Sequence, residues 1–161
     1  MRMKGSQHNA RFDMTKELHL SQLHNPYANE RDEHYCRRWI SVKIIEQMWH
    51  PSAASDPSLL VEAQISQYWQ SPNAYLCLAL AKTEHFGTQD HSSVTLGLLI
   101  NDKLRQLFRF LNDPTLPTYQ VNTTCQRCSM PDCKERVAAP AVLEKIAQQA
   151  KVSQAIEDLE R

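Results

Sequence analysis

The sequence predicts an α+β fold, in which an antiparallel sheet carries flanking helices. Apolar and polar residues alternate over 59–66 and 92–100, an almost wholly apolar run covers 74–81, and apolar residues recur at helical spacing elsewhere. The composition, 42% hydrophobic and 22% charged, is typical of a soluble globular chain. We expect a single domain over residues 12–161, preceded by a disordered tail at residues 1–11.

The charge balance and the absence of long apolar runs limit the classes of partner. Lys and Arg together number 18, and so do Asp and Glu, so no overall field attracts nucleic acid or an anionic membrane. No helix-turn-helix pattern is evident. A transmembrane helix is indicated by an apolar run of about 18 residues or more, and no run in this sequence is that long. No signal peptide is recognisable. We therefore expect a cytoplasmic protein without direct membrane or DNA contact.

The first predicted helix covers residues 30–50 and ends before Pro51. Its apolar stripe recurs at three- and four-residue steps: Tyr35, Trp39, Val42, Ile45 and Trp49. Cys36 lies near the expected start, where the helix dipole would lower its thiol pKa and favour a ligand or reactive sulfur. A cysteine beside aromatic residues is, however, more often part of a core. The preceding segment, 12–23, fits either a strand or a helix.

Three strands are predicted in the middle of the chain, followed by a short edge strand at residues 119–121. For the first of them a helix is the alternative, since Val61, Ile65 and Tyr68 also fit helical spacing. The apolar run 74–81 is typical of a central strand, and Cys77 in its middle is best explained by structural burial. In the strand 92–100, Thr95 and Gly97 lie on one face and are small enough to let a ligand or another backbone approach.

Two further helices are predicted. Asn101 or Asp102 can cap the first, and three cations lie off its apolar stripe: Lys103, Arg105 and Arg109. These cations either face solvent or hold the phosphates of a nucleotide tail. Pro140 opens the second helix, which runs to about residue 160 and whose polar second half is either a homodimer or interdomain arm or a solvated end. The order of elements is typical of sensory modules such as GAF or PAS domains.

Three of the five cysteines lie close together as Cys125, Cys128 and Cys133, with the spacing C-x2-C-x4-C. Thiolates are the soft ligands that zinc and iron–sulfur clusters prefer. Polar neighbours argue against three core cysteines, and a disulfide needs an oxidising compartment. The stretch therefore predicts a metal or cluster site, with a redox pair formed by Cys125 and Cys128 as an alternative.

A fourth ligand for this site has to come from elsewhere. Structural zinc usually takes a second ligand pair, which the chain lacks, whereas a cluster accepts three cysteines and one distant group. Cys36 or Cys77 can supply that group, ahead of His34 and Asp132. Zinc stays open as the alternative metal.

Residues around the three cysteines suit a charged cluster. Thr123 and Thr124 could donate hydrogen bonds to its sulfur atoms and so tune its potential. Arg127, Lys134 and Arg136 would offset the negative charge that thiolate ligands bring.

The run Cys125-x2-Cys128-x4-Cys133-x2-Arg136, with Pro140 soon after, resembles the C-terminal signature of the short-chain fatty acyl transcriptional regulators. The segment from His34 to Trp39 resembles the upstream Cys-Pro-x-Trp element of that family, with Arg37 in place of proline. The resemblance implies the sensory domain of a bacterial regulator, which binds acyl-coenzyme A and an iron–sulfur cluster. It would report both to a separate helix-turn-helix domain that contacts DNA.

We therefore expect a regulatory sensory domain that holds a 4Fe-4S cluster and a short-chain acyl-coenzyme A. The predicted metal ligands are Cys125, Cys128, Cys133 and Cys36, and the basic candidates for cofactor binding are Arg109, Arg127 and Arg136. A structural zinc module in an interaction protein is the alternative. No nucleophile elbow, phosphate loop or zinc-hydrolase motif is present, so we expect no enzyme activity.

Overall fold

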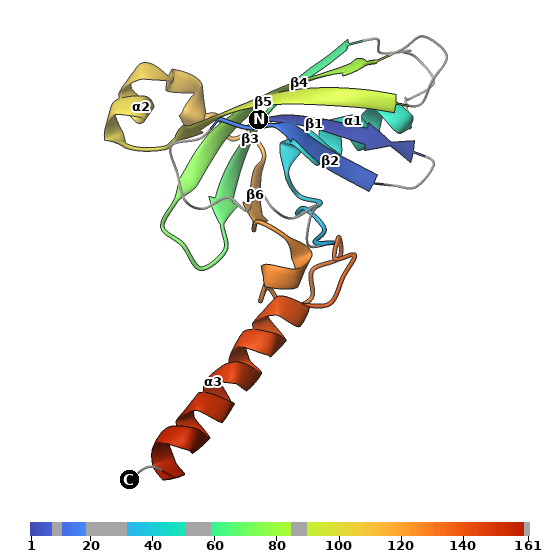
Figure 1. Cartoon of the computed structure of the whole chain (residues 1–161). Coiled ribbons are helices and arrows are strands. Elements are labelled where there is room, and N and C mark those ends of the chain that lie inside the picture. Colours follow the sequence, from blue (N-terminus) through green and yellow to red (C-terminus); the bar gives the residue numbers. More distant parts are fainter. Residues whose placement is uncertain (8–10, 19–31, 51–58, 85–89, 160–161) are drawn as a thin grey trace.

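The computed structural model describes residues 1–7, 11–18, 32–50, 59–84 and 90–159. Within these ranges a curled six-stranded sheet is combined with three α-helices, which confirms the predicted α+β class (Figure 1). The strands are β1 (Arg2–Ser6), β2 (Arg11–Lys16), β3 (Leu59–Tyr68), β4 (Ala74–Thr83), β5 (Asp90–Leu99) and β6 (Thr118–Val121). The helices are α1 (Ile40–Trp49), α2 (Asp102–Leu107) and α3 (Ala141–Leu159), with short 3-10 helices η2 (Arg109–Asn112) and η3 (Cys125–Arg127).

The strands lie in the order β2-β1-β5-β4-β3-β6. All neighbouring pairs are antiparallel except β3 and β6, which are parallel. The expected antiparallel pairing therefore holds for the other described pairs but was wrong at this edge. A parallel pair needs a crossover connection, and the chain between β5 and β6, which contains α2 and η2, is part of it.

The core lies between α1 and one face of the sheet. Val42, Ile44 and Ile45 of α1 are fully buried, and so are Met3 of β1 and Val121 of β6. The apolar stripe predicted for this helix is thus confirmed. Because α1 lies across β1, β3, β4 and β5, it covers the middle of the sheet.

The opposite face of the sheet carries exposed aliphatic side chains. Val61, Leu80 and Val94 are cross-strand neighbours in β3, β4 and β5, and each is exposed. The polar side of β5 faces α1 instead, because the small side chains of Ser93 and Thr95 let the helix approach closely. The alternation predicted for β5 is confirmed, but its polar residues are the buried ones.

The expected disordered tail was wrong for residues 2–6, which form β1. The side chain of Met3 is fully buried, and β1 pairs with both β2 and β5. The buried positions of β1 alternate as Met3 and Gly5, and because Gly5 has no side chain the sequence shows no apolar alternation. Residues 8–10 lie outside the described ranges.

The first predicted helix begins later than expected. The helix α1 starts at Ile40, and the residues from Asp32 to Trp39 form turns and an isolated β-bridge. Glu30 and Arg31 lie outside the described ranges. The predicted end is confirmed, since the last helical residue is Trp49.

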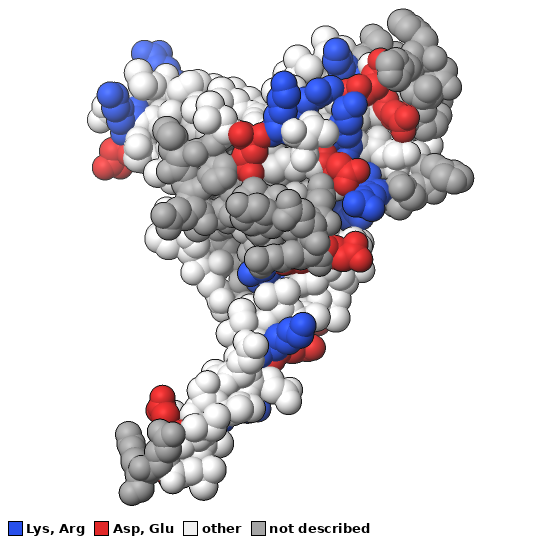
Figure 2. Space-filling model, viewed as in Figure 1, with Lys and Arg blue, Asp and Glu red and all other residues white. Residues whose placement is uncertain are grey.

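The final helix, α3, projects away from the sheet (Figure 1) and has no buried residue. It packs against η3. The visible surface carries interspersed positive and negative side chains (Figure 2), as the balanced composition predicts. Among the described residues, none of the helices has the length and apolar character needed to cross a membrane.

Candidate cysteine site and adjoining cavity

A short backbone pairing brings Cys36 to the loop that carries the other three cysteines. Tyr35 and Thr124 form an isolated antiparallel bridge. The N–H of Cys36 donates to the Thr123 carbonyl at 3.1 Å, and the N–H of Cys125 donates to the His34 carbonyl at 2.9 Å. Of the two cysteines considered as a distant ligand, Cys36 is therefore the one that lies beside the loop.

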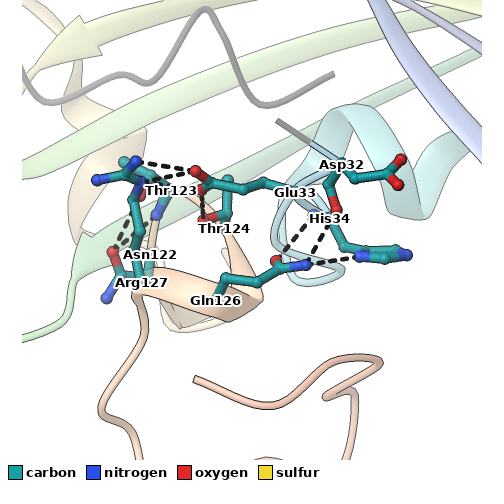
Figure 3. Close-up of polar contacts among 8 residues, drawn as sticks. All are labelled: Asp32, Glu33, His34, Asn122, Thr123, Thr124, Gln126 and Arg127. Carbon is teal, nitrogen blue, oxygen red and sulfur yellow. Dashed lines mark hydrogen bonds and ion pairs between the residues drawn. The ribbon is translucent and has the colours of Figure 1, made fainter. Parts of the chain in front are cut away.

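A buried carboxylate reinforces this pairing (Figure 3). Glu33, whose side chain is 3% exposed, accepts hydrogen bonds from Arg127 Nε at 2.8 Å and from Arg127 Nη2 at 2.8 Å. It also accepts one from Thr124 Oγ1 at 2.7 Å. Charge-assisted bonds to a two-oxygen acceptor are among the strongest in proteins, so Glu33 fixes its own segment to η3.

Gln126 makes a second set of contacts between the same two segments (Figure 3). Its Oε1 accepts from the His34 N–H at 2.9 Å, while its Nε2 donates to the Asp32 carbonyl at 3.2 Å. The Nε2 also lies 2.9 Å from His34 Nδ1. Gln126 therefore pairs with the backbone of Asp32 and with both the backbone and the ring of His34.

The four thiols differ in exposure. Cys125 and Cys128 are buried, whereas Cys36 and Cys133 are half-buried. Burial raises the pKa of Cys36 to about 11, and negative charge on Cys125 and Cys128 would raise it further. Cys36 therefore lies within electrostatic reach of Cys125 and Cys128. The expected lowering of the Cys36 pKa was wrong, because α1 starts only at Ile40.

Arg38 links Cys36 to the far end of the loop. Its Nε donates to Glu135 at 2.7 Å, and the Cys133 Sγ lies 3.8 Å from the same carboxylate oxygen. Burial lowers the pKa of Arg38, but the hydrogen bond to Glu135 and the charges of Cys133, Glu135 and Cys36 outweigh it and raise the pKa overall. A guanidinium thus stands beside two of the four thiols.

Arg136 organises the backbone of the loop. Its guanidinium donates to the carbonyls of Cys125 at 3.1 Å, Cys128 at 3.0 Å, Met130 at 2.8 Å and Ala138 at 3.4 Å. Four carbonyls around one cation hold the loop in a fixed shape. The arginine three residues after the last cysteine therefore has a positioning role.

The other predicted site residues have different positions. Arg127 is paired with Glu33, and the Thr124 hydroxyl donates to Glu33 rather than to a sulfur. Arg109 lies on η2, outside both the loop and the cavity described below. Sequence reasoning missed Glu33, because nothing in the local pattern distinguishes a buried acid from an exposed one.

The donor set was tested for a single metal ion and for a cluster. Within the described part of the chain, no three His, Cys, Asp or Glu side chains are arranged to hold one metal ion. A structural zinc needs its thiolates at about 2.3 Å from one point. A 4Fe-4S cluster binds each thiolate through a different iron, so its sulfur ligands stand farther apart. Among the described residues the thiols are therefore not arranged as a site for a single metal ion.

A cavity of about 810 Å³ adjoins this site. It is bounded by the start of α1, the inner face of β3 to β5 and the helix α2, and most of its lining is apolar. Thr95, Gly97 and Lys103 are among the residues that line it. A Cβ added at Gly97 would meet only the Cys77 Sγ, at 3.9 Å. Cavities of this size accept drug-sized ligands.

One turn connects the cavity to the cysteines. The N–H of Trp39 donates to the Cys36 carbonyl at 3.1 Å, and Trp39 lines the cavity and is the N-cap of α1. The cavity lining and the cysteine site therefore meet within one turn of backbone.

Comparison with known proteins gives no relative from which a role could be transferred. No family model matches the chain, and no curated protein or solved structure is significantly similar to it. The geometry of the site is therefore the basis for its function.

Proposed function

We propose that this chain is the sensory domain of a cytoplasmic bacterial transcriptional regulator, with a GAF- or PAS-like fold. In this proposal Cys36, Cys125, Cys128 and Cys133 hold a 4Fe-4S cluster, and the cavity binds a short-chain acyl-coenzyme A. The observation that carries the proposal is the hydrogen-bonded turn from Cys36 to Trp39, which joins the cysteine site to the cavity. The domain has no catalytic role in this scheme.

The thiols and their neighbours supply what a cluster requires. When bound, the cluster supplies one-electron redox chemistry and sensitivity to oxidants. Arg38 lies near two of the thiols and reduces the cost of gathering their negative charges. Arg136 keeps the loop carbonyls in place, and the Glu33–Arg127 pair keeps Cys36 beside them.

The helix α3 provides the output. It packs against η3, which begins at Cys125, so the conformation of the cysteine loop determines the direction of α3. A ligand in the cavity contacts Trp39 and acts on the same loop through Cys36. Cluster assembly and ligand binding both favour the same arrangement of α3. Two sites that favour one conformation are thermodynamically coupled. DNA is contacted by a separate helix-turn-helix domain.

The cavity suits the two parts of an acyl-coenzyme A. Its apolar lining would contact the acyl chain, and Lys103, at the start of α2, would contact a phosphate. Arg105 and Arg109 continue the basic series beyond the cavity.

Anaerobic reconstitution with iron and sulfide tests the cluster. We expect wild-type protein to bind about four irons per chain and to develop the visible thiolate-to-iron absorption. Each of the variants C36S, C125S, C128S and C133S should lose most of that absorption. C77S is the matched control, since Cys77 lies in β4 and lines the cavity.

Two outcomes would contradict the cluster. Wild-type protein that stays colourless and binds one zinc would favour the structural zinc module. Equal absorption in wild type and C125S would show that iron binds elsewhere.

A further inference from the structure

The face of the sheet that α1 does not cover carries a continuous aliphatic surface, which we call the outer aliphatic face. Its residues lie on β3, β4 and β5, where Leu59 on β3 adjoins two cross-strand rows: Val61, Leu80 and Val94 in one row, and Ala63, Leu78 and Leu96 in the next. Among the exposed members, the exposed fraction is lowest for Leu80, at 39%, and highest for Val61, at 69%. Hydrocarbon on three adjacent strands is therefore in contact with water, which is unfavourable.

The area of the outer aliphatic face is close to what a pair of copies requires. From the exposed fractions, its side chains present roughly 500 Å² per copy, so contact between two copies would bury roughly 1,000 Å² in total. A specific interface between proteins needs about 1,000 Å² or more, and obligate dimers bury about 2,000 Å² or more. The face is therefore large enough for a reversible dimer and too small for a permanent one.

The shape of this surface suits a second copy of the same sheet. Two sheets that pack face to face lie about 10 Å apart, and aliphatic side chains from their facing sides interdigitate. A two-fold axis brings one surface into contact with itself, so a single self-complementary face is sufficient. The outer aliphatic face offers no polar group in its two rows that would select a different protein.

The charges at the border of the face do not favour a lipid surface. Arg2 and Lys4 of β1 both donate to Glu84, at 2.6 Å and 3.1 Å, so their charges are already balanced within the chain. Lys82 adds one cation at the same border. Segments that bind membrane surfaces usually combine several free cations with Trp or Phe, whereas the side chains of this face are all aliphatic.

We propose that the outer aliphatic face is a homodimer interface, in which the sheets of two copies pack face to face about a two-fold axis. An axis perpendicular to the strands separates the two copies of Lys82, because the border of one copy then lies over the opposite end of the other. The dimer needs neither the cluster nor a ligand in the cavity. It brings two copies of α3 into one assembly.

Sedimentation equilibrium of the purified full chain tests this interface. We expect wild type to change from monomer to dimer between about 5 and 500 μM, as a reversible interface of this size does. Leu80 lies on the middle strand, between Val61 and Val94, and L80E should weaken dimerisation at least about tenfold, because each copy would bury a carboxylate. The matched control is I146E in α3, where an aliphatic side chain of similar exposure is replaced and dimerisation should be unchanged.

A charge-swap experiment tests the two-fold contact directly. L80K alone should also be monomeric, because two ammonium groups would meet near the axis. An equal mixture of L80E and L80K should recover dimerisation, since opposite charges then face each other. At concentrations where wild type is monomeric, both variants should melt within about 3 °C of it, because substitutions of exposed side chains change stability by about 0.5 kcal/mol or less.

Four results would overturn the proposal. Wild type could stay monomeric over the whole range, L80E could dimerise as well as wild type, or the mixture of L80E and L80K could stay monomeric. The fourth is loss of the dimer in I146E with retention in L80E, which would assign the contact to α3. Flotation with vesicles of phosphatidylcholine and phosphatidylserine is run in parallel. Monomeric wild type that binds these vesicles, with loss of binding in L80E, would assign the face to a lipid surface instead.

Discussion

At the scale of single residues, Gly5 shows how closely β1 and α1 pack. A Cβ added there would lie 2.7 Å from Ile45 Cγ2 and 3.0 Å from Phe12 Cε1. Both side chains belong to the buried core, so neither can move without disturbing others. We expect Gly5→Ala to lower the free energy of unfolding by about 1–3 kcal/mol, as overpacking does. Urea unfolding of the purified wild-type and variant chains measures this difference in the free energy of unfolding.

Gly97 is the matched control for this substitution. It lies in β5, where an added methyl group meets no atom closer than the Cys77 Sγ at 3.9 Å. Gly97→Ala should leave stability unchanged or raise it slightly, because alanine has less freedom in the unfolded chain. Equal destabilisation by the two substitutions would show that the close contact at Gly5 is not the cause.

The types of individual residues are visible in the sequence, but their neighbours are not. The spacing of Cys125, Cys128 and Cys133 predicts a thiolate site, and this stays a prediction. The role of Glu33 depends on segments distant in sequence, so no local pattern reveals it.

At the scale of elements, the pairing of residues 32–36 with η3 depends on the Glu33–Arg127 ion pair. Arg127 is 29% exposed, whereas Glu33 is almost completely buried. Removing the arginine leaves a carboxylate that water cannot reach. We expect Arg127→Leu to lower the free energy of unfolding by about 3–5 kcal/mol. It should also increase the rate at which Cys36 reacts with a thiol reagent.

Arg38→Leu serves as the comparison for this prediction. Arg38 pairs with Glu135, whose side chain is well exposed, and surface pairs contribute about 0–1 kcal/mol. Chemical denaturation and thiol labelling of both variants give the two quantities. If Arg127→Leu is no more harmful than Arg38→Leu, the buried carboxylate does not hold the segment in place.

Elements with a strong local signal could be predicted, and those made by distant pairing could not. The strands β3, β4 and β5 follow from alternation and apolar content. The Asn101 cap of α2 is confirmed by its bond to the Leu104 N–H. In contrast, β1 forms only because β2 and β5 flank it, and α1 starts late because the residues before Ile40 pair with the cysteine loop.

At the scale of the whole molecule, α3 contributes little to the stability of the domain. None of its residues is buried, so removing its second half exposes no core. We expect a chain that ends at residue 150 to melt within about 2 °C of the full chain, because a stability change well below 1 kcal/mol gives a shift of this size. Thermal unfolding followed by circular dichroism gives the comparison.

A clear fall in melting temperature would contradict this view of α3. It would mean that the helix packs against something in solution, such as a second copy of the chain. Sedimentation of both forms distinguishes that case, because a dimer held by α3 would dissociate on truncation.

The overall architecture could be predicted only in outline. The order of elements gave the α+β class, but the parallel edge formed by β6 arises from the crossover after β5. At the candidate site the residue types were evident, but the position of Cys36 beside the cysteine loop was not, because it depends on the bridge between Tyr35 and Thr124.

The aliphatic side chains on the outer face of β3, β4 and β5 have a consequence for the handling of the protein. Val61, Leu80 and Val94 form a hydrocarbon row that water covers in the isolated chain. Salts that strengthen apolar attraction, such as sulfates, will drive such rows together. We therefore expect concentrated solutions of the protein to aggregate less at low sulfate concentration. In crystals grown from sulfate, we expect copies of the chain to contact one another through this face.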